Sequence, residues 1–236
     1  MLIKKIIVGA LLVFLSMPVL GQTPQSAEAY YKAGDYQAAQ SLYETQTQQQ
    51  PHRAELWFNL GNTYYRLGYK GKAIWAYLKA RQLQPRDKEL NANLALVRSQ
   101  VVGSSDRHTL NKLTLPEWSF IVLICLTLLN TLVISKRKGW LKGELVHNLF
   151  YCLAVITFMF SLAWGYTCYQ TFYIVRGVAI TNEIEVKSGP DSGMSRLFVM
   201  SEGTEVRVLE KTTGWIKIQL QNGYAGWVTV SDIGLL

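Results

Sequence analysis

Trp57 to Pro85 read WFNLGNTYYRLGYKGKAIWAYLKARQLQP, and this stretch decides the fold of the N-terminal part of the chain. Trp57, Leu60 and Tyr64 are spaced three and four residues apart, so a helix places them on one face. Gly68 can end that helix, and Pro85 cannot continue a second one. The stretch therefore predicts two consecutive amphipathic helices that pack against each other.

The same stretch follows a register of about 34 residues. Counted from Ala54, its Trp, Leu, Gly and Tyr, and then its Ala, Tyr, Ala and Pro, fall at the positions of the pattern W-x2-L-G-x2-Y…A-x3-F…A…P. This spacing resembles the tetratricopeptide repeat (TPR), with Tyr77 in the aromatic position. The small residues Gly61 and Ala73 would let the two helices approach each other closely.

A weaker copy of the pattern lies one repeat earlier. The matching pairs are Gly34 and Gly68, Ala39 and Ala73, Tyr43 and Tyr77, and Pro51 and Pro85. We therefore expect an all-α TPR domain over 22–107, with repeats at about 22–53 and 54–87 and an end helix over 88–102. Stable arrays usually need three repeats. We therefore expect that these helices pack against the membrane portion or a partner, or that the unit is only marginally stable.

A repeat array of this kind binds extended peptides or helices on its concave face. In the TPR family that face comes from the first helix of each repeat. The resemblance implies that the partner-binding residues are Glu28, Tyr31, Lys32, Phe58, Asn62, Tyr65 and Arg66. The alternative interpretation is that these residues form an ordinary solvated helix face.

Long apolar runs predict targeting and membrane segments. Residues 1–21 begin with a basic stretch followed by an apolar one, which predicts a signal peptide cleaved after Gly21; an uncleaved anchor is the alternative. Two later runs predict transmembrane helices over 116–135 and 149–169.

The loop between those two runs, 136–148, is strongly basic. It contains Lys136, Arg137, Lys138 and Lys142 against Glu144 alone, whereas the outer flanks are balanced. The positive-inside rule places this loop in the cytoplasm. We therefore expect a two-pass protein of the bacterial inner membrane, with the TPR domain and the C-terminal segment on the periplasmic side.

In the C-terminal segment, 176–236, apolar and polar residues alternate in short runs, and turn residues separate these runs. Val206 and Val208 share one face of such a run, as do Ile216 and Ile218 of the next. Asn222-Gly223 between two runs indicates a tight hairpin. About 60 residues arranged this way predict an all-β barrel of five or six short strands.

This segment resembles bacterial SH3-like (SH3b) domains. The matching elements are Val186-Lys187-Ser188-Gly189-Pro190, Glu202-Gly203-Thr204, Gly214-Trp215 and Gly226-Trp227-Val228. The segment departs from the family at Glu185, where Asn is usual, and at Lys187, which is usually Arg. Such domains bind cell-wall peptides or protein segments in a shallow aromatic groove, which implies Trp215, Tyr224 and Trp227 as ligand-binding residues. The alternative is that the Gly-Trp tryptophans pack the barrel.

The sequence points away from catalysis and from nucleic acid. The net charge of +8 does not form a basic stripe with interleaved aromatic residues. Cys125, Cys152 and Cys168 all fall in the apolar runs, and no GxSxG, HExxH or phosphate-binding glycine loop occurs. We therefore expect no enzyme, no catalytic residue, no cofactor and no metal site.

The whole order of segments resembles the BatE-type TPR and SH3b membrane proteins of the Bat (Bacteroides aerotolerance) operon. That resemblance implies a scaffold in a membrane complex whose partners carry von Willebrand A domains and are linked to a MoxR-type ATPase, with a role in aerotolerance or envelope stress. A cell-wall tether that grips peptidoglycan through its SH3b domain is the alternative function.

Overall fold

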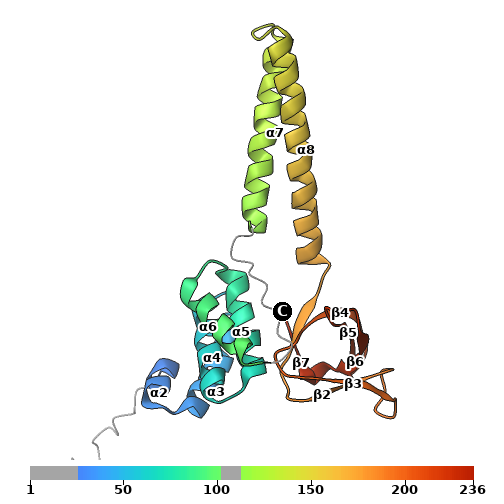
Figure 1. Cartoon of the computed structure of the whole chain (residues 1–236). Coiled ribbons are helices and arrows are strands. Elements are labelled where there is room, and N and C mark those ends of the chain that lie inside the picture. The colour runs from blue at the N-terminus through green and yellow to red at the C-terminus, as the bar shows by residue number, and fades with distance from the viewer. Residues whose placement is uncertain (1–25, 102–112) are drawn as a thin grey trace, which may run out of the picture.

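The computed structural model describes residues 26–101 and 113–236. In these residues, short helices are followed by two long helices and by a seven-stranded antiparallel sheet that curls into a small barrel (Figure 1). This arrangement confirms the predicted fold class: TPR-like helices, two apolar helices that could span a membrane, and an SH3-like sheet. The predicted signal peptide, 1–21, lies outside the described residues.

The TPR region consists of paired helices with well-defined ends. Ser26, Asp35 and Asp87 begin three of them, each accepting a hydrogen bond from the backbone N–H three residues later. Gly34 and Gly68 follow α2 and α4 in the left-handed conformation, with φ of 84° and 83°. The helices are α2 (Ala27–Ala33), α3 (Tyr36–Gln49), α4 (Ala54–Arg66), α5 (Lys70–Leu83) and α6 (Lys88–Ser99).

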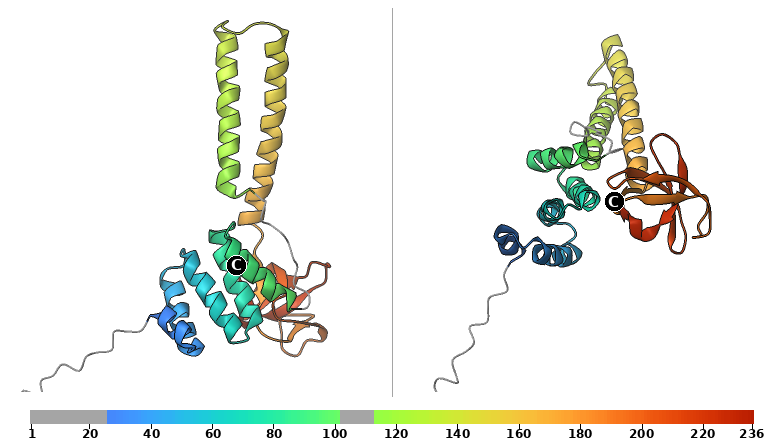
Figure 2. Two further views of the ribbon diagram at one scale, coloured as in Figure 1. Left: turned by 60° about the vertical axis from the view of Figure 1, so that its left-hand side comes forward. Right: turned by 60° about the horizontal axis from the view of Figure 1, so that its bottom comes forward.

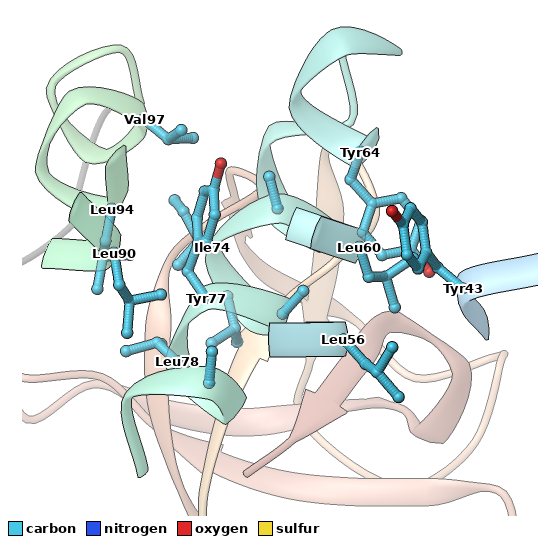
Figure 3. Close-up of a cluster of buried hydrophobic side chains, with 14 of the residues drawn as sticks. Tyr43, Leu56, Leu60, Tyr64, Ile74, Tyr77, Leu78, Leu90, Leu94 and Val97 are labelled. Atoms are coloured by element: carbon cyan, nitrogen blue, oxygen red, sulfur yellow. The ribbon is translucent and has the colours of Figure 1, made fainter. Parts of the chain in front are cut away.

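The core of this region is centred on the contact between α4 and α5. Gly61 lies so close to the ring of Tyr77 that a Cβ there would stand 2.6 Å from Cδ1 and Cε1. The Tyr77 hydroxyl donates a hydrogen bond to Asn62 Oδ1 at 2.6 Å. Figure 3 shows the cluster, with side chains of α5 between those of α4 and α6. The small residue Gly61 therefore allows α4 and α5 to approach each other closely, as the sequence predicts.

The two long helices, α7 (Leu115–Arg137) and α8 (Glu144–Phe172), form an antiparallel hairpin (Figures 1 and 2). Both are long and apolar enough to cross a membrane. Trp164 Nε1 donates to Ser119 Oγ at 2.9 Å, which links them near one end. The helix α8 extends beyond the predicted span of 149–169 at both ends and begins inside the predicted loop.

The C-terminal sheet has the strand order β3-β2-β6-β5-β4-β1-β7. Its buried face includes Val206, Ile216 and Ile218, as the alternation predicts. Seven strands replace the predicted five or six because two very short strands, β1 and β7, pair with each other. The strands are β1 (Arg176–Ala179), β2 (Ile184–Lys187), β3 (Arg196–Met200), β4 (Glu205–Lys211), β5 (Trp215–Gln219), β6 (Ala225–Thr229) and β7 (Ile233–Leu235).

The barrel packs directly on the TPR helices, side by side in every view (Figures 1 and 2). Gly71 N donates to Glu202 Oε2 at 2.9 Å, and Trp75 Nε1 donates to the Leu235 carbonyl oxygen at 2.9 Å. Val178 of β1 is fully buried in the same hydrophobic cluster as the TPR core. The short array therefore packs against the barrel, a neighbour that the sequence did not suggest.

A buried ion pair reinforces this interface. The Arg98 side chain, at the end of α6, is 4% exposed and donates to the carboxylate of Glu205 on β4. A buried guanidinium that loses its carboxylate partner is strongly destabilising, so this pair ties the two surfaces together. Arg86, between α5 and α6, makes a second link by donating to both carboxylate oxygens of Glu117 at the start of α7, at 2.5 and 2.8 Å. The TPR helices thus form ion pairs both with the barrel and with α7.

Candidate partner-binding surfaces

Residues of α2, α3 and α4 line an open cavity of about 420 Å³, whereas the barrel packs against α5. Five of the seven residues predicted for the concave face lie there together. The lining residues are Glu28, Tyr31, Lys32, Tyr43, Glu55, Phe58, Asn59 and Asn62. A neighbouring cavity of about 320 Å³ shares Glu28, Tyr43, Glu55 and Asn59, so the two form a continuous recess.

The other two predicted residues are held elsewhere. Arg66 donates from Nε and Nη2 to the hydroxyl oxygen of Tyr36, at 2.9 and 2.6 Å, and its guanidinium lies over that ring. The Tyr65 hydroxyl accepts a hydrogen bond from Gln100 Nε2 at 3.0 Å. Both residues therefore connect helices and do not line the recess.

The recess is polar but carries little unbalanced charge. Glu28 and Lys32 form an exposed ion pair at 2.6 Å, and the hydrogen bond from Lys32 lowers the pKa of the Glu28 carboxyl. Burial raises the pKa of Tyr31, and it raises the pKa of Tyr43 to about 12, so both phenols are neutral donors at physiological pH. Such a lining suits the backbone and polar side chains of a peptide better than a strongly charged ligand.

Asn62 is fixed within this surface by the core behind it. Its Oδ1 accepts from the Tyr77 hydroxyl at 2.6 Å and from Asn93 Nδ2 at 3.1 Å. The amide N–H groups are then the donors that Asn62 can offer to a partner. A polar group whose position is set by two hydrogen bonds is preorganised for binding.

Sequence reasoning missed Tyr43, Glu55 and Asn59. The helical period contained the signal for two of them, because Glu55, Asn59 and Asn62 lie four and three residues apart and share a face of α4 with Phe58. Tyr43 was assigned only to the repeat core, although it is buried at the boundary between the core and the recess.

Two of the three residues predicted for the SH3b groove lie near each other. Lys187 stands opposite Trp227 in the sheet, and its Nζ lies 6.0 Å from the centroid of the Trp215 ring. Trp227 is only 8% exposed, but it lies outside the hydrophobic core of the barrel, on the same face of the sheet as Trp215.

Trp215 starts β5, whereas Tyr224 lies past the other end of that strand, in the turn before β6. Tyr224 is 66% exposed and its ring contacts Phe198, with centroids 6.1 Å apart. Leu197 and Val199 on the edge strand β3, on either side of Phe198, are also exposed.

Within residues 26–101 and 113–236, no group of three or more His, Cys, Asp or Glu side chains is arranged to hold a metal ion. The three cysteines lie on α7 and α8.

Comparison with known proteins identifies the parts of the chain on either side of the two long helices. Residues 54–87 match the tetratricopeptide repeat family, and residues 182–233 match the family described as bacterial SH3 domain. No curated protein matches the chain. The solved structure of MamA AMB-1 aligns with 23% identity and a TM-score of 0.31, over 31% of this chain and 40% of that chain. This chain thus joins a TPR repeat, a module of protein–protein interaction, to a bacterial SH3 domain, a module associated with cell-wall binding.

Proposed function

We propose that this protein is a non-catalytic scaffold of the bacterial envelope that binds protein partners through its TPR helices. The observation that carries the proposal is the open recess of α2, α3 and α4, whereas the barrel packs against α5. Both matched families are binding modules, which supports a scaffold over an enzyme.

The proposed topology puts both modules on the periplasmic side of the inner membrane. The TPR helices precede α7 and the barrel follows α8, so both attach at the same end of the hairpin (Figure 1). The other end carries Lys136, Arg137 and Lys138, which favours the cytoplasm for it. Reporter fusions at Gly139 should read as cytoplasmic and fusions at the C-terminus as periplasmic; the reverse pattern overturns the topology.

We further propose that the partners are membrane proteins with von Willebrand A domains, in a Bat-type complex for aerotolerance or envelope stress. The order of TPR, membrane hairpin and SH3b domain supports this assignment. Chemical crosslinking of the full-length chain in native membranes, followed by mass spectrometry, would identify such partners. Retention of every partner after deletion of 22–107 would contradict a role for the TPR helices.

A paired substitution sharpens that experiment. Glu55→Ala with Asn59→Ala removes two recess side chains from the solvent side of α4, and it should abolish capture of the partners. Thr45→Ala with Gln48→Ala is the matched control, because both residues are exposed on α3 outside the recess. Equal loss with both pairs would point to general destabilisation and would count against the recess as the binding site.

The alternative is a cell-wall tether that binds peptidoglycan through the barrel. It is favoured by the exposed aromatic surface at Tyr224 and by the match to bacterial SH3 domains. The detergent-solubilised full-length chain should then sediment with purified sacculi, and Tyr224→Ala should reduce the sedimented fraction. Tyr69→Ala, at an exposed tyrosine outside the barrel, should leave it unchanged. Absence of sedimentation at high protein concentration would exclude the tether.

A further inference from the structure

Two arginines stand directly opposite each other at the top of the barrel. Arg176 of β1 pairs with Arg207 of β4, and Arg207 pairs in turn with Gln219 of β5. Directly opposed residues on antiparallel strands share a face, with Cβ atoms about 4.5–5.5 Å apart, and like charges at such positions destabilise a sheet. Buried Val206 and exposed Arg207 confirm that this row lies on the outer face.

The same row lines a cavity of about 270 Å³, together with Gln170 and Glu205. Glu205 is already paired with Arg98. Among the described residues, neither Arg176 nor Arg207 forms an ion pair with a carboxylate. Arg176 Nη2 donates to Gln170 Oε1 at 2.8 Å, which holds its guanidinium beside the cavity. The cavity therefore has two guanidinium groups, three side-chain amides and one carboxylate in its lining, with a net positive charge.

The position of the cavity relates it to the membrane hairpin. Gln170 belongs to the last turn of α8, and three residues separate that helix from β1. Tyr169 and Tyr173, on either side of Gln170, stack with ring centroids 5.6 Å apart. Tyrosines of this kind favour the level of the lipid headgroups. If α8 crosses the membrane as proposed above, the cavity lies at that level.

We propose that this cavity binds the phosphate of an anionic phospholipid headgroup. The inference rests on the membrane-anchored arrangement of the proposed function. Arginine is suited to this role because its planar guanidinium gives two parallel hydrogen bonds to phosphate oxygens. A phosphate between Arg176 and Arg207 also removes the repulsion of the unoccupied pair. A bound lipid would hold the barrel against the membrane surface and so fix the direction in which the TPR recess faces.

Native mass spectrometry of the full-length chain in detergent tests this proposal, with phosphatidylglycerol, phosphatidylcholine or inorganic phosphate added. Phosphatidylglycerol should bind the wild type in preference to phosphatidylcholine. Arg176→Gln with Arg207→Gln should reduce phosphatidylglycerol binding about tenfold or more, since two charge-assisted contacts are lost. Arg196→Gln with Lys211→Gln removes the same charge from the barrel outside the cavity and should leave binding intact.

Equal binding of phosphatidylglycerol to the wild type and the cavity variant would overturn the proposal. Displacement of the lipid by millimolar inorganic phosphate would show a free-anion site and would overturn the lipid assignment. Without lipid, the cavity variant should melt at the wild-type temperature or above it, because a repulsion is removed; a large decrease would show that the arginines serve the fold instead. Partner capture is measured separately, so its failure would reject the scaffold while leaving the lipid site standing.

Discussion

At the scale of single residues, Gly61 shows how closely α4 and α5 approach. In most helices Gly→Ala stabilises by about 1 kcal/mol through propensity. Here the new Cβ would lie 2.6 Å from the Tyr77 ring, which is itself fully buried. Overpacking costs about 1–3 kcal/mol, so Gly61→Ala should lower the free energy of unfolding on balance. Chemical denaturation followed by circular dichroism measures the change. Gln37→Ala, an exposed helical position on α3, should be neutral or slightly stabilising.

Tyr43 gives a prediction about pH at the same scale. Burial raises the pKa of its phenol to about 12 from 10.0, so the folded state favours the neutral form. The stabilisation is complete below pH 10 and is lost as the pH rises through 12. At pH 11 the wild type should therefore have lost about 1 kcal/mol more than Tyr43→Phe, relative to neutral pH. Denaturation midpoints between pH 9 and 11 measure this difference. Tyr69→Phe, at an exposed tyrosine, should follow the wild type; identical pH profiles for all three proteins would contradict the argument.

At the scale of elements, α5 is shared between two packing partners, and Gly71 is where it meets the barrel. A Cβ on Gly71 would stand 2.5 Å from the Ala179 carbonyl oxygen, and backbone cannot move as cheaply as a side chain. Gly71→Ala should therefore push α5 away from the barrel. Amide hydrogen exchange should increase in α5, β1 and β7, whereas β5 should keep its protection. Lys70→Ala, one residue earlier, is the control. A uniform increase over the whole barrel would indicate unfolding instead of separation.

The elements also show what the sequence could predict. The 34-residue register located α4 and α5 because eight positions of one repeat matched, and the strand alternation found the buried Ile216 and Ile218. The register does not constrain residues that face away from the repeat core. It therefore did not predict that Gly71 and Trp75 contact the barrel. Their hydrogen-bond partners lie 131 and 160 residues away in the chain. A local pattern does not encode contacts at that separation.

At the scale of the whole molecule, the TPR helices and the barrel share hydrophobic packing. Val178 of the barrel is buried among the TPR side chains, and Gly203 lies against Ile74 and Val101. A short repeat array is stabilised by its neighbours more than by its own units. The barrel is therefore expected to act as a structural cap on α5, so the direction in which the proposed partner-binding recess faces depends on where the barrel is held.

That dependence gives the prediction for the whole chain. A protein truncated after Val175 keeps both long helices but exposes the side of α5 that Leu235 and Glu202 contact in the full chain. It also removes the Glu205 carboxylate that pairs with Arg98 of α6 in the full chain. Hydrogen exchange in α5 and α6 should therefore rise by at least about tenfold on truncation, with α7 and α8 unchanged as an internal reference. Unchanged protection of α5 would show that the TPR helices fold independently and that the barrel does not stabilise them.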